Sequence, residues 1–309
     1  MTVPFRFTRR AAAALVGAAL IAPGAQAAEL GATEDPIRLA LVEWTGQHLT
    51  TRIIGSTLEE MGYDVEYVSV GYLVSGAAAA DGDVHATLEV WDNNLGDLFP
   101  QLLEEGRLEN LGDVGLDAGE GWMYPSHVAE MCPGLPSWEA VQDCAQEFAT
   151  AETFPQGRFL SYPADWSNRS EVLIEGEDLN YKAVPSGSEG ALVAELKAAA
   201  ETDSPLLMMF WAPHWVLSEV DVEWVDMPQE IREEYSITKP GVFKAVWPGL
   251  KDKWPAAYEV IAAAKITNEI QEPLMARIDR DGEDTEAVVA EWMAANEDVW
   301  RPWIETATN

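Results

Sequence analysis

Three tryptophans stand at the carboxyl ends of predicted strands. The runs PIRLALVEW, DVHATLEVW and LLMMFW end at Trp44, Trp91 and Trp211 respectively, and Trp166 follows another predicted strand by a few residues. In open α/β sheets, ligands bind outside the carboxyl ends of the strands. We therefore expect these four indole rings to line a cleft between two lobes, where small-molecule pockets commonly form.

A group of tryptophan rings suits one ligand chemistry in particular. The face of an indole is negative and attracts a cation with about 0.5–2 kcal/mol. A quaternary ammonium has no hydrogen to donate, so aromatic rings suit it better than a carboxylate does. Three or four rings at ~1.5 kcal/mol each, with burial of the methyl groups, approach the roughly 8 kcal/mol of a micromolar dissociation constant. The sequence thus predicts a cage for a trimethylammonium-type head.

The competing explanation is that the tryptophans belong to the core. For a single tryptophan this is the commoner role, because the ring is large and is rarely buried in full. The cage hypothesis depends on three strand ends that carry the same residue. The tryptophans expected to be structural or on the surface are Trp122, Trp138, Trp224, Trp247, Trp254, Trp292, Trp300 and Trp303.

Alternating strands and helices would position the cage residues. Hydrophobic periodicity predicts both kinds of element in the first part of the chain. The predicted strands are 36–44, 63–68 and 83–91, and the predicted helices are 47–61, 72–80 and 95–105. This order implies a parallel sheet with helices on its faces. The glycine-rich stretch 112–122 then predicts a domain boundary.

A second, smaller α/β unit follows this boundary. Its predicted elements are helices 137–150 and 188–201, strands 158–162 and 206–211, and a strand at 222–225 that crosses back. The rest is expected to be helical, at 254–264, 266–277 and 285–296. We therefore expect an α/β protein of two lobes, each a mainly parallel sheet flanked by helices. Lobe 1 would hold 28–121 and 218–309, lobe 2 would hold 122–217, and strands near 120 and 218 would form a hinge.

The chain is strongly acidic. It has 19 lysines and arginines against 53 aspartates and glutamates, and a formal net charge of −34. This charge excludes nucleic acid and anionic membrane surfaces as partners. Because the acids are spread along the whole chain, they favour a solvated acidic shell for a salty habitat over a general attraction for cations.

The first 27 residues have the pattern of a secretory signal peptide. Arg6, Arg9 and Arg10 precede an apolar stretch, and Ala25-Gln26-Ala27 is a small-x-small cleavage site. We expect cleavage near Ala27 and a soluble protein in the periplasm. Cys132 and Cys144 agree with export, since a disulfide is the best explanation for two cysteines in an oxidising compartment.

Several stretches resemble the periplasmic glycine betaine/choline-type substrate-binding proteins of ABC importers. The stretches are VEWTGQ, TLEVWDNNL, YPSHV, CPGLPSWEAVQDC, FWAPHW and the C-terminal DGEDTEAVVAEWMAANEDVWRPW. The resemblance runs from about Pro36 to Trp303. It implies a type II periplasmic-binding-protein fold, a ligand held between two lobes by an aromatic box, and a membrane permease that docks on the closed form.

The resemblance also assigns candidate ligand-binding residues by position. They are Trp44, Trp91, Trp211, Tyr124, Trp166 and Trp215, together with Glu43 and His127. Tyr124 fits an aromatic that choline-binding members add. Those members often carry an aspartate two residues after the first box tryptophan, where this chain has Gly46, and Glu43 precedes that tryptophan instead. The anionic end of a ligand would need donors such as Gln47, His48 or His127. The sequence does not choose among glycine betaine, choline and trimethylamine N-oxide as the ligand.

Catalytic motifs are not found in the sequence. The four histidines form no pair with a glutamate at zinc-site spacing, and neither G-x-S-x-G nor a nucleotide fingerprint occurs. IDRDGEDTE resembles half a calcium loop but has Ala290 in place of the final glutamate, so we expect a helix start capped at Asp284 or Thr285. Ser186 or Ser188 is likewise expected to cap a helix. His214 is expected to hold its loop, with no second metal ligand nearby.

The prediction is therefore a monomeric binding protein without catalytic residues, metal or cofactor. One alternative is another small zwitterion, such as dimethylsulfoniopropionate. An amino acid or a sulfonate would need a convergent arginine, for which Arg169 is the candidate. A secreted hydrolase would need a nucleophile and a base side by side, which the sequence does not offer.

Overall fold

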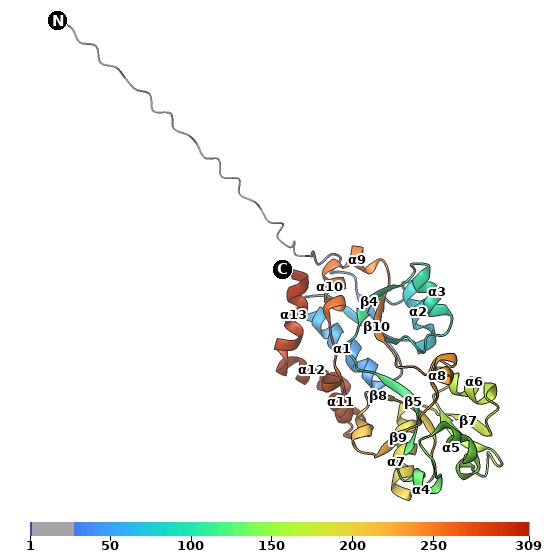
Figure 1. Ribbon diagram of the computed structural model, residues 1–309. Coiled ribbons are helices and arrows are strands. Elements are labelled where there is room, and N and C mark those ends of the chain that lie inside the picture. Colours follow the sequence, from blue (N-terminus) through green and yellow to red (C-terminus); the bar gives the residue numbers. More distant parts are fainter. Residues whose placement is uncertain (2–27, 309) are drawn as a thin grey trace.

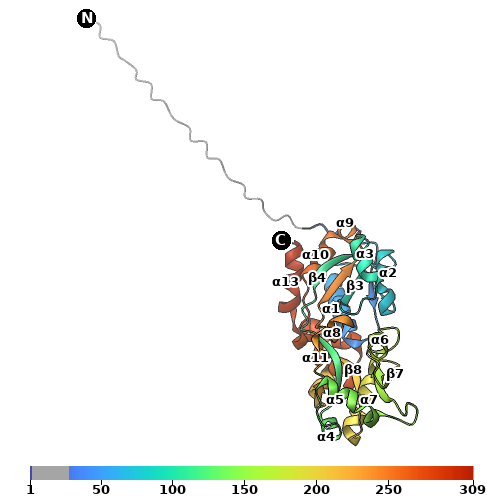
Figure 2. The ribbon, with the colours of Figure 1, turned by 45° about the vertical axis from the view of Figure 1, so that its right-hand side comes forward.

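The computed structural model describes Met1 and residues 28–308. The predicted signal peptide lies outside the described residues. The chain folds into two lobes that lie one above the other in Figure 1, and the same arrangement is seen in the turned view of Figure 2. Among the described residues, no helix combines the length and the apolar character needed to cross a membrane. The expected two-lobed α/β class is confirmed.

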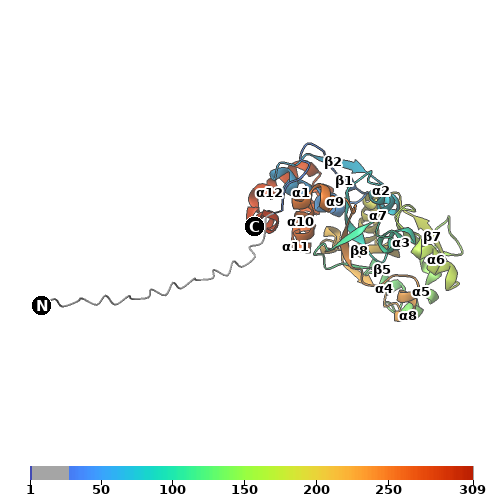
Figure 3. The same cartoon turned by 90° about the horizontal axis from the view of Figure 1, so that it is seen from above.

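The first lobe is built on a five-stranded sheet of order β2-β1-β3-β10-β4. Its strands are β1 (Ile37–Leu41), β2 (Val65–Ser69), β3 (Ala86–Trp91), β4 (Glu109–Asp113) and β10 (Val242–Val246). Its helices are α1 (Thr45–Glu60), α2 (Tyr72–Ala80), α3 (Leu98–Glu104), α9 (Leu250–Lys253), α10 (Pro255–Ala263), α11 (Asn268–Met275), α12 (Thr285–Ala295) and α13 (Glu297–Thr308). Seen from above, β1 and β2 lie between α1 and α2, so helices cover both faces (Figure 3).

The second lobe contains a sheet of order β7-β6-β8-β5-β9. Its strands are β5 (Gly119–Pro125), β6 (Gly157–Ser161), β7 (Tyr181–Pro185), β8 (Met208–Ala212) and β9 (Val222–Trp224). Its helices are α4 (Val128–Met131), α5 (Trp138–Asp143), α6 (Arg169–Gly176), α7 (Glu189–Thr202) and α8 (Gln229–Glu234). Ser188 caps α7 by accepting the N–H of Ala191, and Asp284 caps α12 in the same way, as the sequence predicts.

Both sheets are mixed rather than mainly parallel. β10 runs antiparallel to β3 and β4, and β5 runs antiparallel to β8 and β9. β10 lies between the predicted strand 222–225 and the predicted helix 254–264, in a stretch with no predicted strand. The glycine-rich stretch 112–122 was expected to be a domain boundary, but β5 begins within it, at Gly119. β9 pairs with β5, so the chain returns to the first sheet after Trp224, later than the expected residue 218.

The parallel strands of each sheet bring the site residues to one edge. β1 and β3 are parallel neighbours in the first sheet, and β6 and β8 are parallel neighbours in the second. Their carboxyl ends therefore share an edge within each lobe. Trp91 ends β3, Trp44 comes three residues after the end of β1, and Trp211 is the last residue but one of β8.

The predicted disulfide is present between Cys132 and Cys144, twelve residues apart in sequence. Closing a loop of this size stabilises a protein by about 3 kcal/mol in the chain-entropy account. We expect replacing both cysteines by serine to lower the free energy of unfolding by about this amount. Urea unfolding of the oxidised protein and the double variant measures the difference. Neither cysteine lines the site described below, so ligand affinity should be unchanged; equal unfolding midpoints would contradict the prediction.

Candidate functional site

The carboxyl ends of the strands meet around one aromatic cavity between the lobes. The cavity is small, with a volume of about 30 Å³ for the centres of water-sized spheres. The lining residues are Trp44, Tyr72, Trp91, Asn94, Glu120, Tyr162, Trp166 and Trp211. Six of the eight are aromatic, and both lobes contribute. We call the four tryptophans of this cavity the tryptophan cage.

The cage rings hold one another across the cleft. Trp44 of the first lobe meets Trp166 of the second edge-to-face, with 5.4 Å between ring centroids. Trp166 in turn meets Trp211 at 5.8 Å. Each of the four cage tryptophans is only 4–6% exposed. The structure is therefore a closed conformation in which water has little access to the cage.

A buried glutamate lies behind the two tryptophans of the first lobe. Glu89 is 2% exposed and accepts the indole N–H of Trp44 at 2.7 Å and that of Trp91 at 3.4 Å. Its other carboxylate oxygen accepts the hydroxyl of Thr50 and the amide of Gln271, each at 2.8 Å. Glu89 thus fixes the orientation of both rings without lining the cavity itself.

A β-bulge in β3 positions this glutamate. Val90 pairs with Phe243 and Leu88 pairs with Lys244, so Glu89 has no partner on β10. Its φ is 105°, an unusual value for a residue with a side chain. Bulges re-aim side chains and are frequent beside functional sites, where strained residues are also concentrated.

Two opposing effects set the pKa of Glu89. Burial disfavours the charged form, whereas the hydrogen bonds from Trp44, Thr50, Trp91 and Gln271 favour it. Burial is the larger effect and raises the pKa of Glu89 to about 7. A carboxyl that titrates near neutral pH therefore lies in contact with the cage.

Gly46 makes this arrangement possible. A Cβ at Gly46 would lie 3.1 Å from the amide of Gln271, closer than most carbon contacts. Gln271 donates to the carbonyl of Gly46 as well as to Glu89. A side chain at this position would press on Gln271, whose amide is held between Gly46 and Glu89.

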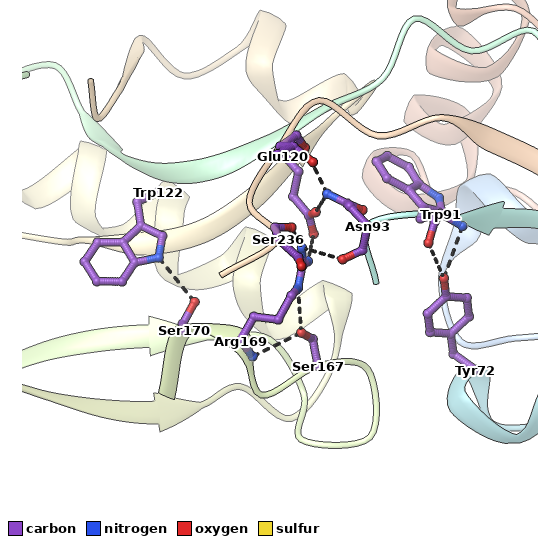
Figure 4. A network of polar contacts seen from close by, with 10 residues as sticks. Tyr72, Trp91, Asn93, Glu120, Trp122, Ser167, Arg169, Ser170 and Ser236 are labelled. Carbon is purple, nitrogen blue, oxygen red and sulfur yellow. Dashed lines mark hydrogen bonds and ion pairs between the residues drawn. The ribbon is translucent and has the colours of Figure 1, made fainter. Parts of the chain in front are cut away.

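A second acid lies on the cavity wall itself and is held by an ion pair (Figure 4). Glu120, at the start of β5, accepts from the guanidinium of Arg169 at 2.7 Å and from the amide of Asn93 at 2.7 Å. The side chains of Arg169 and Glu120 are 12% and 3% exposed. Arg169 also donates to the backbone carbonyls of Asn93 and Ser236. The ion pair lies within the second lobe, and its hydrogen bonds to Asn93 join it to the chain that leaves β3 of the first lobe.

Four of the predicted ligand-binding residues meet at the cavity, and four do not line it. Trp44, Trp91, Trp166 and Trp211 come together as expected. The predicted site residues outside the cavity lining are Tyr124, Trp215, Glu43 and His127. Tyr124 is buried in the second lobe and donates to Glu223, and Trp215 donates to Asp279. His127 contacts the carbonyl of Ser204 at the far end of that lobe, and Glu43 is exposed.

Four lining residues and Glu89 are not predicted from the sequence. The missed lining residues are Tyr72, Asn94, Glu120 and Tyr162. Tyr72 and Tyr162 follow predicted strands and could be found by the argument that finds Trp44. Glu120 lies in β5 four residues before Tyr124, within a glycine-rich stretch that resembles a linker. Glu89 is a charged residue in the middle of an apolar strand, which is the available signal for a buried functional acid.

A polar cluster also bridges the lobes beside the cage. His214, expected to have no second metal ligand nearby, lies with Glu189 and Asp279, and their ligand atoms are within 4.8 Å of one another. Nδ1 of His214 accepts the N–H of Val216, so in the neutral ring Nε2 carries the hydrogen. That atom faces Glu189 Oε1 at 3.3 Å. Both atoms are buried and neither has a hydrogen-bond partner among the described residues, so the contact is an ion-pair distance and not a hydrogen bond.

The carboxylates of this cluster hold the closed form. Glu189 of the second lobe accepts the N–H of Thr45, the first residue of α1, at 2.9 Å. Asp279 of the first lobe accepts the indole N–H of Trp215 in the second at 3.0 Å. Burial, followed by the charge of Glu189, raises the pKa of Asp279 to about 6. Opening the cleft would break both bonds.

Two α/β lobes that enclose an aromatic cavity define a two-lobed solute-binding protein. The sequence matches, over residues 35–295, the family described as the substrate-binding domain of ABC-type glycine betaine transport systems. The chain belongs to this family.

Individual relatives agree with this membership. A trimethylamine N-oxide-binding protein of Pelagibacter ubique is 29% identical over 289 residues, which is 88% of this chain and 91% of that protein. An ABC-transporter choline-binding protein in complex with choline superposes with a TM-score of 0.78 at 18% identity, covering 88% of this chain and 92% of that one. The lactococcal protein in its closed conformation with glycine betaine gives 0.72 at 21% identity, covering 87% and 99%. These structures share the fold.

Proposed function

We propose that this chain is the periplasmic substrate-binding component of an ABC importer and that its ligand is a methylated ammonium osmolyte held in the tryptophan cage. The observation that carries the proposal is the group of four buried tryptophans around one cavity between the lobes. Indole faces attract a cation that cannot donate hydrogen bonds, and a dry cage strengthens the attraction. The closed lobes would then be the form that the permease recognises, with the protein acting as a monomer.

The charges around the cavity favour a ligand without a carboxylate. Glu120 lines the cavity, and its one cationic partner, Arg169, is already bonded to Glu120 and to two carbonyls. The carboxylate of glycine betaine would meet Glu120 with no free cation to hold it. Trimethylamine N-oxide and choline carry only a small oxygen opposite the methyl groups. Of the three osmolytes, we propose trimethylamine N-oxide first, in line with the 29% identical relative, then choline, with glycine betaine weakest.

Tyr162 is the candidate donor to the ligand oxygen. It lines the cavity beside Trp166 and Trp211. Burial, together with the negative charge of Glu120, raises the pKa of Tyr162 well above its usual value. The phenol therefore keeps its hydrogen at any physiological pH, and it could turn that hydrogen from Glu120, with which it interacts, to an N-oxide or a hydroxyl.

The arginine-based alternative loses support in the structure. An amino acid or a sulfonate would need Arg169 to be free to bind its acid group. Arg169 does not line the cavity, and its Nε and Nη1 donate to Ser167, Asn93 and Ser236. The amino acid and sulfonate alternatives are therefore not proposed further.

Isothermal titration of the purified mature protein tests the proposal. The ligands are trimethylamine N-oxide, choline, glycine betaine and dimethylsulfoniopropionate, each at low and high salt. We expect micromolar binding of trimethylamine N-oxide or choline, at least about tenfold tighter than glycine betaine. Salt should have little effect because the cage is desolvated. Tightest binding of glycine betaine would contradict the proposed order, and no heat with any of the four would overturn the proposed function.

A further inference from the structure

The four cage tryptophans are not equivalent, because only two of them contact an acid through their indole N–H. Trp44 and Trp91 donate to Glu89, whereas Trp166 and Trp211 have no bond to it. We propose that Glu89 is a positioning residue whose carboxylate acts through Trp44 and Trp91 as the counter-charge of the bound ammonium, so that ligand capture is coupled to the loss of a proton. This inference rests on the proposed function.

The hydrogen bonds around Glu89 are those of an ionised carboxylate. Oε1 accepts from Trp44 and Trp91, and Oε2 accepts from Thr50 and Gln271. The indole and amide groups can only donate at these atoms. A carboxyl hydrogen on Oε2 would find one acceptor here, the hydroxyl of Thr50. The four hydrogen bonds therefore favour the charged form of Glu89, while burial opposes it.

Glu89 has no cationic partner among the described residues. The charged or titratable side chains on the elements packed against it are Arg38, His48, Arg52, Glu59, Glu60, Tyr72, Lys244, Glu269 and Glu272. None of these is hydrogen-bonded to Glu89. Arg38 and Lys244 donate to backbone carbonyls, and Arg52 pairs with Glu286. Across the cavity, Glu120 and Arg169 are paired with each other. A buried charge without a partner is costly, and a cation in the cage would offset that cost.

The two indoles transmit the charge to the cavity. An N–H group bonded to an anion draws electron density into the ring, which makes the ring face more attractive to a cation. The same bonds lock the orientation of Trp44 and Trp91. Neither effect requires Glu89 to touch the ligand, and Glu89 is not among the residues that line the cavity.

The direction of the pH dependence follows from this coupling. Burial raises the pKa of Glu89 to about 7, so near neutral pH part of the protein carries the protonated acid. A cation in the cage favours the ionised form and lowers that pKa. Binding should therefore release a proton to solvent, and affinity should be highest above pH 7 and fall as the pH drops below it.

Calorimetry on the wild-type protein tests the coupling without any mutation. Choline and trimethylamine N-oxide are titrated from about pH 5.5 to about pH 8.5, in pairs of buffers with different heats of ionisation. The ammonium of choline does not titrate, so any proton released with choline comes from the protein. We expect about half a proton released at pH 7 and a larger fraction at about pH 6, and a dissociation constant about 10–30-fold larger at the acidic end.

Three variants assign the proton to Glu89. Glu89→Gln should lose the proton release and bind at least about tenfold more weakly at about pH 8.5, whereas Glu89→Asp should keep the release. Glu272→Gln is the matched control, because burial also raises the pKa of this neighbouring acid. It should behave as the wild type.

The outcomes distinguish a failure of the role of Glu89 from a failure of the proposed function. Binding by the wild type with no proton release overturns the role of Glu89 and leaves the proposed function standing. Proton release that persists in Glu89→Gln also overturns it. No binding of either ligand by the wild type would overturn the proposed function, and the role of Glu89 with it.

Discussion

Replacing Trp211 by alanine should weaken binding of the methylated ammonium ligand by at least about tenfold. The substitution removes one ring of the cage, with a cation contact of about 0.5–2 kcal/mol, and also the apolar surface that covers the methyl groups. Trp211 is the best choice of ring because its indole has no bond to Glu89. The loss of affinity would therefore measure the contribution of the Trp211 ring, without a contribution from Glu89.

Titration calorimetry of Trp211→Ala against the wild type measures this effect. Trp211→Phe should fall between the two, because a smaller ring keeps part of the cation contact. Trp224→Ala is the matched control, since Trp224 is 37% exposed on β9 and does not line the cage. If Trp211→Ala and Trp224→Ala both bind as the wild type does, the tryptophans are core residues and the cage hypothesis is wrong.

The cage could be predicted because it depends on local patterns. Trp44, Trp91 and Trp211 each end an apolar run, and strands that are parallel neighbours must bring their carboxyl ends to one edge. The strand ends themselves can be found without knowing which strands pair. The shared edge places the four tryptophans on one cavity and also explains why Tyr72 and Tyr162, which follow strands in the same way, join them there.

The acids of the site could not be predicted because they depend on pairing between distant segments. Glu89 faces the cage because β3 is bulged against β10, more than 150 residues later in the chain. β10 was itself missed, since its centre is Lys244, a residue rarely found in a buried strand. Lys244 is tolerated because it donates to the carbonyls of Ala262 and Ala264, which sequence spacing does not reveal.

The same limit explains the errors around β5. The glycines near Glu120 resemble a linker, yet β5 pairs with β8 through Glu120↔Trp211 and so lies beside the cage. Assigning Tyr124 to the cage by resemblance placed the contact four residues too far along this strand. Tyr124 is instead paired with Glu223 of β9 inside the second lobe. Register, not composition, decides which residue of β5 reaches the cavity.

The second large effect is expected from Arg169→Met, which should lower the free energy of unfolding by about 3–5 kcal/mol. The substitution removes the guanidinium from Glu120, whose side chain is 3% exposed, and leaves that carboxylate buried with only the amide of Asn93 as a partner. It also removes the bonds from Arg169 to the carbonyls of Asn93 and Ser236. Urea unfolding without ligand measures the loss.

Two further variants show whether the unpaired charge is the cause. Arg158→Met removes a comparable ion pair with Glu195, whose side chains are 21% and 45% exposed, and should cost no more than about 1 kcal/mol. In the Arg169→Met background, Glu120→Gln removes the charge that has lost its partner and should restore part of the stability. If the double variant is instead less stable than Arg169→Met, the loss comes from packing and broken carbonyl contacts, and Glu120 is not the buried charge that Arg169 compensates.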